Sequence, residues 1–141
     1  MTLWIEGYAS RFARADLNDD IVARGAFRDS LVRSGAGGVR MLYQHQTSSV
    51  IGVWDEVAED AEGLFVRGRV FELSPEARMV AALIRAGAVD GLSIGFRAVR
   101  SRREGRLRVL SAVELMEVSV VSFPMLPSAR ITSVWDEAVA A

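Results

Sequence analysis

The sequence contains no cysteine and only one histidine, His45, among its 141 residues. The absence of cysteine excludes disulfide bridges, thiolate catalysis and thiolate zinc sites. A single histidine also excludes a metal cage built from several imidazoles, so a metal site would have to rely on carboxylates. We therefore expect a protein without a metal or another cofactor.

The sequence also lacks an excess of either charge and a long apolar run. Its 17 basic residues, all of them arginine, nearly balance 18 acidic residues and leave a net charge of −1. This balance gives no general attraction to nucleic acid or to a membrane. No apolar run approaches the roughly 20 residues that span a bilayer, and the N-terminus lacks the pattern of a signal peptide. We therefore expect an intracellular protein.

Alternation of apolar and polar residues, together with turn residues, predicts about seven β-strands. They are expected at residues 3–9, 39–45, 49–60, 63–73, 91–101, 107–115 and 116–124. Helices are expected at 26–33 and after Ser74, which can cap a helix that begins at Pro75 and ends before Gly87. Residues 1–130 should form one domain, and 131–141 a loosely held C-terminal tail.

The frequent hairpins favour a mainly β fold with helices, of the α+β class. We expect a small closed or nearly closed antiparallel β-barrel with the helices packed outside it. A doubly wound parallel sheet is disfavoured, because strands and helices do not alternate along the chain.

Residues 91–95 spell Gly-Leu-Ser-Ile-Gly, which fits the G-x-S-x-G pattern of a nucleophile elbow around Ser93. In α/β-hydrolases the elbow joins a strand to a following helix, and the acid and the histidine come after the serine. Here a predicted helix precedes Ser93, a predicted strand follows it, and His45 lies upstream. The α/β-hydrolase fold is therefore excluded, and the glycines equally fit a bulge or a close backbone approach.

A serine nucleophile needs a base at neutral pH, and His45 is the only histidine available. It is expected at the end of an apolar strand, where a polar loop begins. A third group should orient the imidazole, and Glu114 and Glu117 are both candidates. Glu117 lies in an apolar segment, where an unpaired carboxylate is costly, so its partner should be an arginine or the histidine.

Five segments in collinear order, spanning residues 6–131, resemble the prohead proteases of tailed bacteriophages. They are "EGYAS" with "DLNDDIVARGAF", "YQHQTSSVIG", "EGLFVRGRV", "LIRAGAVDGLSIGF" and "LMEVSVVSFPMLPSARI". By this resemblance His45 matches the general base, Ser93 the nucleophile and Glu117 the acidic third member. The resemblance also implies the fold of the herpesvirus assemblins, a small β-barrel ringed by helices. Val50 departs from the family pattern, which has a proline before Ile-Gly.

The resemblance implies a serine endopeptidase that cleaves the scaffolding segment of a major capsid protein, with the protease itself as a further substrate. It implies self-association inside an assembling procapsid in the bacterial cytoplasm. Gly95 and Arg97 are candidates for contacting the oxyanion or the substrate. Two alternatives stay open: a catalytically inactive scaffold or capsid assembly component with a protease-like fold, and a small esterase that uses the same serine.

Two charged segments have simpler interpretations than a binding site. Residues 100–108 contain five arginines, which could contact nucleic acid, but a solvated hairpin is the preferred interpretation. Asp16, Asp19 and Asp20 could hold a cation, but they lack the spacing of a calcium loop and fit turn and capping chemistry. We therefore expect no specific nucleic-acid, membrane or metal partner.

Overall fold

The computed structural model describes residues 1–138, in which eight strands form one sheet. The strands are β1 (Thr2–Arg11), β2 (Asp20–Val22), β3 (Arg40–Tyr43), β4 (Gln46–Glu59), β5 (Gly63–Phe71), β6 (Gly91–Glu104), β7 (Leu107–Val121) and β8 (Ile131–Asp136). The helices are α1 (Arg28–Ser34), a short 3₁₀ helix (Ala36–Gly38) and α2 (Pro75–Arg85). None of the helices in this part of the chain is long and apolar enough to cross a membrane.

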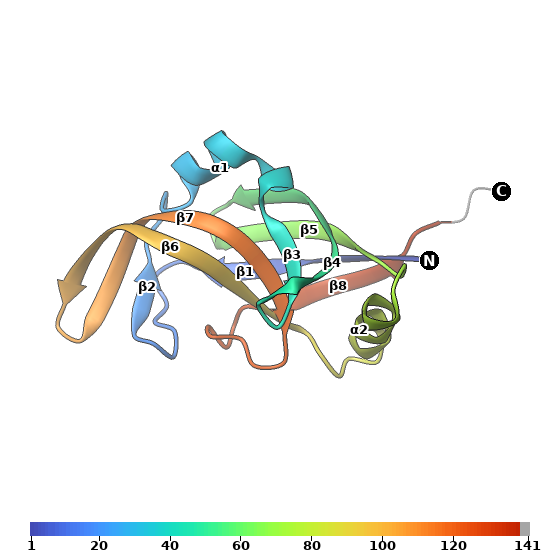
Figure 1. The fold of residues 1–141 in the computed structure, drawn as a ribbon. Coiled ribbons are helices and arrows are strands. Elements are labelled where there is room, and N and C mark those ends of the chain that lie inside the picture. Colours follow the sequence, from blue (N-terminus) through green and yellow to red (C-terminus); the bar gives the residue numbers. More distant parts are fainter. Residues whose placement is uncertain (139–141) are drawn as a thin grey trace.

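The strands follow the order β2-β7-β3-β4-β5-β1-β8, and β6 pairs with the other edge of β7. β2 and β3 both run parallel to β7, whereas the remaining pairs are antiparallel. In Figure 1 the sheet is strongly curved, α1 lies over one side of it, and the β6–β7 hairpin extends beyond β3, with β2 beside its outer part. The hairpin is joined to the rest of the sheet through β7, which pairs with β3.

The structure confirms a mainly β fold with helices. The strand pairing does not close the sheet into a barrel, so the predicted closed or nearly closed barrel is not confirmed. The paired strands end at β8 on one side and at β6 on the other, and an isolated bridge joins Gly91 to Arg130. The expectation of antiparallel pairing throughout was wrong. Turn composition reports only on strands that are neighbours in the sequence, so it could not reveal the parallel pairing of β3 with β7.

Three elements differ from their predicted extents. β7 is one continuous strand where two were expected, and β2 lies where no strand was expected. β8 occupies the first part of the expected tail, where Trp135 stacks on Trp4 of β1 with ring centroids 5.9 Å apart. Most β8 side chains are exposed, which explains the weak sequence pattern. Residues 139–141 of the expected tail lie outside the described residues.

The predicted capping of the longer helix is confirmed. Ser74 Oγ accepts a hydrogen bond of 3.1 Å from the backbone N–H of Ala77, and Pro75 occupies the first helical position. Gly87 follows the helix with a φ of 74°, a conformation that suits glycine. The other predicted helix begins later than expected, at Arg28, because residues 24–27 form a turn in which Glu59 accepts the backbone N–H groups of Gly25 and Phe27.

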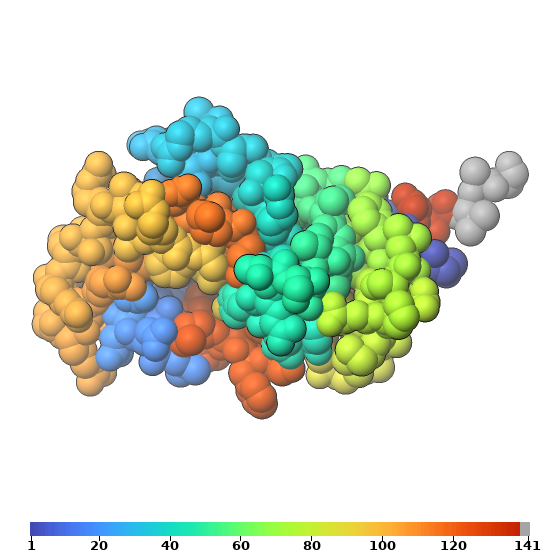
Figure 2. Space-filling model, viewed as in Figure 1, coloured from blue at the N-terminus to red at the C-terminus, as the bar shows by residue number. Residues whose placement is uncertain are grey.

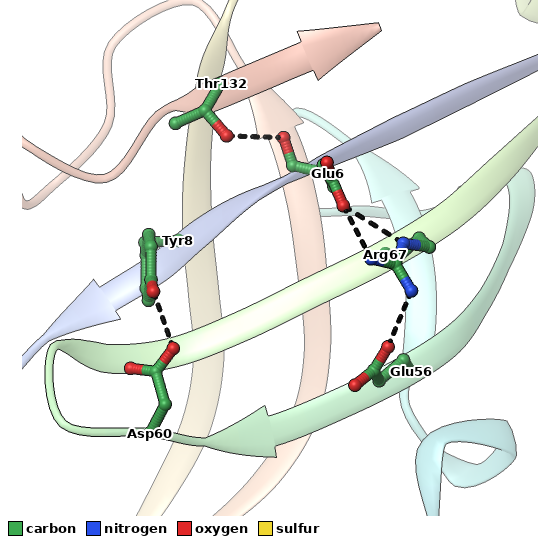
Figure 3. A network of polar contacts seen from close by, with 6 residues as sticks. All are labelled: Glu6, Tyr8, Glu56, Asp60, Arg67 and Thr132. Carbon is green, nitrogen blue, oxygen red and sulfur yellow. Dashed lines mark hydrogen bonds and ion pairs between the residues drawn. The ribbon is translucent and has the colours of Figure 1, made fainter. Parts of the chain in front are cut away.

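A polar network covers the face of the sheet formed by β1, β4 and β5 (Figure 3). Arg67 donates to Glu6 at 3.0 Å and to Glu56 at 2.9 Å, and so joins three strands. Tyr8 donates to Asp60 at 2.5 Å. Exposed ion pairs of this kind typically contribute at most about 1 kcal/mol each. The network lies outside the site described next, and the fold depends mainly on the buried apolar side chains from the strands and α2.

Candidate active site

His45 lies in a two-residue turn between β3 and β4, where Tyr43 pairs with Gln46. Both turn residues have positive φ, 53° for Gln44 and 59° for His45. Positive φ at both positions is typical of a type I′ hairpin turn, which usually carries Asn-Gly. The predicted polar loop after His45 was therefore wrong, because the residues from Gln46 onward belong to β4. Figure 2 shows this turn, in teal, at the surface.

Four hydrogen bonds fix this turn to β7 and the residue after it. Gln44 donates its backbone N–H to Val120 O at 2.9 Å, and His45 donates its own to Ser119 Oγ at 3.0 Å. The Gln44 side chain donates to Ser122 Oγ at 2.6 Å and accepts from the Ser122 N–H at 3.1 Å. A non-glycine residue in a sparsely populated conformation costs about 1–3 kcal/mol. The bonds to β7 offset that cost and fix the backbone that carries the imidazole.

Glu117 of β7 is the partner of His45. Its Oε2 lies 2.6 Å from His45 Nδ1, and its Oε1 accepts a hydrogen bond of 2.7 Å from Ser119 Oγ. Only 9% of the residue is exposed. Both carboxylate oxygens therefore have partners, which explains how a buried carboxylate is tolerated in an apolar strand. Of the two partners left open by the sequence, the structure places the histidine and not an arginine at this carboxylate.

The hydrogen bond with Glu117 sets the protonation of the imidazole. An ionised carboxylate can only accept, so Nδ1 carries the proton and Nε2 of the neutral ring keeps a free lone pair. The same hydrogen bond raises the pKa of His45 above 6.5, and it outweighs the desolvation that lowers it. The ring is thus held in the tautomer that can accept a proton at Nε2.

Ser93 lies on β6, opposite Ser119 of β7, and is 6% exposed. Together with His45 it lines a cavity of about 220 Å³. The remaining walls are apolar, polar and charged: Ala9, Val22, Leu92, Ile94, Phe96, Leu110, Met125, Leu126, Ser10, Asn18, Arg11, Arg14, Asp16, Asp20 and Arg108. The hydrogen bonds found in residues 1–138 do not include one from Ser93 to His45. Such contacts often form only when substrate is bound.

The two glycines around Ser93 provide space. A Cβ at Gly95 would lie 2.6 Å from Cδ of Glu117, and a Cβ at Gly91 would lie 2.7 Å from the carbonyl oxygen of Val121. At Gly91 the neighbour is backbone, so the position requires glycine, whereas at Gly95 a side chain would displace the Glu117 carboxylate. The G-x-S-x-G spelling therefore reflects a close approach of β6 to β7, as the simpler interpretation of the motif predicted.

The other predicted residues have different surroundings. Glu114 accepts a hydrogen bond of 3.1 Å from Arg97, whose side chain is 70% exposed. The cavity that holds Ser93 is lined by neither Gly95 nor Arg97. Asp16 accepts hydrogen bonds from two backbone N–H groups of its own turn, as turn chemistry predicted. Residues 1–138 contain no cluster of three acidic or histidine side chains arranged to hold a metal.

Sequence reasoning missed Ser119, whose hydroxyl contacts both His45 and Glu117. A signal for it was available, because residues two apart on a strand point to the same face. Ser119 follows Glu117 at that spacing. A serine beside a buried carboxylate on the same face is a natural hydrogen-bond donor to it.

A serine and a carboxylate-bonded histidine that line one cavity form the kind of centre that serine hydrolases use. Residues 1–140 match the family of Caudovirus prohead serine proteases, and the chain belongs to that family. Over 133 residues it is 35% identical to the prohead protease of Enterobacteria phage HK97. The alignment covers 91% of this chain and 58% of that relative, so the chain spans little more than half the relative's length.

Two solved structures have a similar fold. The bacteriophage T4 capsid assembly protease matches with a TM-score of 0.68 and 15% identity, over 84% of this chain and 80% of that one. A protease of Kaposi's sarcoma herpesvirus (KSHV), solved with a hexapeptide phosphonate inhibitor, matches with a TM-score of 0.62 and 10% identity. That match covers 97% of this chain and 66% of the herpesvirus chain. At these identities the likeness concerns the fold.

Proposed function

We propose that this chain is a serine endopeptidase of capsid maturation. Its substrate is the scaffolding segment of a major capsid protein, and it also cleaves itself, inside a procapsid in the bacterial cytoplasm. Membership of the prohead protease family supports the substrate class. The observation that carries the chemistry is the 2.6 Å hydrogen bond between His45 Nδ1 and Glu117, beside the cavity that contains Ser93.

In the proposed reaction, Ser93 Oγ attacks the scissile carbonyl and His45 Nε2 takes the hydroxyl proton. The imidazolium that forms is stabilised at Nδ1 by Glu117. Nε2 then gives its proton to the leaving amine as the C–N bond breaks, which leaves an acyl group on Ser93. Water, deprotonated by the same nitrogen, then attacks the acyl carbonyl. The bond from that carbon to Ser93 Oγ breaks, Nε2 returns its proton to Oγ, and the carboxylic acid product leaves. All steps of this cycle use side chains within residues 1–130.

A shell that encloses protease and substrate makes their encounter effectively intramolecular. Confinement raises the effective concentration of each partner for the other. An enzyme with modest intrinsic affinity can therefore process many capsid subunits, and its activity is confined to the particle. The same confinement raises the effective concentration of the protease for itself and so promotes its self-association within the procapsid.

Co-expression with the cognate capsid protein tests the proposal. The wild-type protease should yield a shortened capsid protein, and Ser93→Ala should leave it at full length. Ser101→Ala is a matched control, because Ser101 lies on the same strand but its side chain is exposed. A capsid protein that stays intact with wild-type and Ser93→Ala protease alike would favour the inactive scaffold.

The esterase alternative is separated by substrate. Purified wild-type protein should cleave the capsid protein at its scaffold boundary, and Ser93→Ala should not. Cleavage of p-nitrophenyl esters without cleavage of any peptide would replace the endopeptidase by an esterase.

A further inference from the structure

One buried hydroxyl contacts both the histidine and the glutamate of the candidate site. Ser119 Oγ accepts the backbone N–H of His45 at 3.0 Å and donates to Glu117 Oε1 at 2.7 Å. The residue is fully buried, on β7 between β6 and β3. Ser119 therefore links the backbone of the turn that carries the imidazole to the far oxygen of the carboxylate that binds it.

The directions of these bonds are fixed by chemistry. A backbone N–H can only donate and an ionised carboxylate can only accept, so the single hydroxyl proton of Ser119 must point at Glu117. The three groups then form a closed ring, which runs from the His45 ring to Glu117, on to Ser119 and back to the His45 backbone. A closed ring of directional bonds restricts rotation of the carboxylate and displacement of the turn together.

We propose that Ser119 is a positioning residue, whose hydroxyl fixes the position of the His45 turn relative to the Glu117 carboxylate. This inference rests on the proposed function, because Ser119 acts through His45 and Glu117 and lines no part of the cavity that holds Ser93. The geometry of the turn explains why such a residue is needed. His45 and Gln44 both have positive φ, and a turn of two non-glycine residues in that conformation keeps its shape only when its surroundings hold it.

Removal of the hydroxyl has two consequences. Glu117 Oε1 loses its donor in a buried setting, and the His45 N–H loses its acceptor. The carboxylate is then free to rotate away from Nδ1, and the hydrogen bond that raises the pKa of His45 weakens. The other charged groups lining the cavity beside His45 are Arg11, Arg14, Asp16, Asp20 and Arg108. Among the charged groups around the imidazole, Glu117 is the one that raises its pKa.

Ser119→Ala tests the inference kinetically. We expect kcat on a capsid-derived peptide to fall about tenfold to a hundredfold, with KM changed less than about twofold, because the change misplaces the base without touching bound substrate. Ser30→Ala is the matched control. Ser30 is also buried, and its hydroxyl also accepts a backbone N–H of β7, from Leu115 at 2.9 Å. It should lower thermal stability to a similar degree and leave kcat near the wild-type value.

A titration of His45 provides a readout that needs no turnover. Because the protein has a single histidine, one set of imidazole NMR signals reports its pKa. In a Ser93→Ala background, adding Ser119→Ala should lower that pKa toward 6.5, and adding Ser30→Ala should leave it unchanged. If the alanine variant folds poorly, Ser119→Cys can replace it, because cysteine keeps a side chain of similar size with a weaker donor. It should also lower the pKa of His45.

Either of two results would overturn the inference: equal losses of kcat in the Ser119 and Ser30 variants, or a His45 pKa that stays unchanged or rises when Ser119 is replaced. The proposed protease function fails separately, if Ser93→Ala still shortens the capsid protein. The titration tests the positioning role whether or not the chain is a protease, because the pKa of His45 depends on the fold and not on cleavage.

Discussion

The two halves of the β6–β7 hairpin have opposite properties although they belong to the same pair of strands. The inner half, residues 91–95 with 117–121, is mostly buried and contains Ser93, Glu117 and Ser119. On β6 the outer half is mostly exposed, and its Arg97 and Arg102 pair with glutamates at the surface. In the inner half β7 pairs with β3 and binds the His45 turn, whereas in the outer half it pairs with the short strand β2.

Glu114 and Glu117 show what this difference does to one residue type. They lie three residues apart on β7, but Glu114 pairs with the exposed Arg97, and Glu117 pairs with His45 and Ser119. A carboxylate in water with an arginine partner forms an ordinary surface ion pair. A buried carboxylate whose two oxygens bind an imidazole and a hydroxyl can orient a base. Residues three apart on a strand point to opposite faces, so the face of β7, and not the residue type, decides which role is possible.

The largest expected effect comes from exchanging the two glutamates for glutamine one at a time. Glu117→Gln should lower kcat by about 10³-fold to 10⁴-fold, because an amide can present its NH₂ group to Nδ1 and stabilise the wrong tautomer. Glu114→Gln should leave kcat within about twofold of wild type, because only a surface ion pair is lost. Peptide-cleavage kinetics of both variants measure the contrast, and a larger loss from Glu114→Gln would reverse the assignment of the third catalytic member.

A smaller effect is expected from adding a methyl group to Gly95. Its Cβ would lie 2.6 Å from Cδ of Glu117, so the carboxylate must move away from His45. We expect kcat to fall about tenfold to a hundredfold and the free energy of unfolding to drop by about 1–3 kcal/mol. Gly37→Ala is the control, since a Cβ there meets nothing within 4 Å. Full activity in Gly95→Ala would show that catalysis does not require the Glu117 carboxylate in the position seen beside His45.

The two halves should also differ in their effect on the pH–rate profile, where a modest shift of the midpoint is expected. kcat/KM should rise with pH as His45 loses its proton, with a midpoint above 6.5, because the hydrogen bond with Glu117 raises that pKa. Glu114→Gln should leave the midpoint in place. A wild-type midpoint at or below 6.5, read from the pH–rate profile, would be inconsistent with the ion pair in the inner half.

The raised pKa also has a consequence for stability. Folded protein binds the His45 proton more tightly than unfolded protein, so this stabilisation is fully present below about pH 6.5. It is lost as the pH rises through the higher pKa of the folded state. Urea unfolding should therefore show a small decline in the free energy of unfolding over that interval. His45→Ala should abolish the decline, and a decline that persists in this variant would assign it to another group.

The smallest effect belongs to the outer half. A double-mutant cycle on Arg97 and Glu114 should give a coupling energy below about 1 kcal/mol, because the Arg97 side chain is 70% exposed. Added salt should weaken the coupling. A coupling of several kcal/mol that is insensitive to salt would show that the outer half is desolvated in solution, for example by self-association.

Local patterns were enough to predict much of this protein. The alternation of residues located most strands, and Ser74, Pro75 and Gly87 marked the ends of α2. The lone histidine and the serine between two glycines identified the candidate base and nucleophile. Residue types alone left Glu114 and Glu117 as alternatives, and the family resemblance favoured Glu117. Local patterns missed β2 and β8, because β2 is very short and β8 exposes most of its side chains.

What the sequence determined by itself is the set of chemical groups and the local preference for strand, turn or helix, since these depend on neighbours a few residues apart. The tertiary structure alone decided which groups meet. The parallel pairing of β3 with β7 places His45 beside Glu117, 72 residues further along the chain, and brings Ser119 against both. Contacts over such separations depend on how strands pair across the whole sheet, and no short stretch of sequence encodes that pairing.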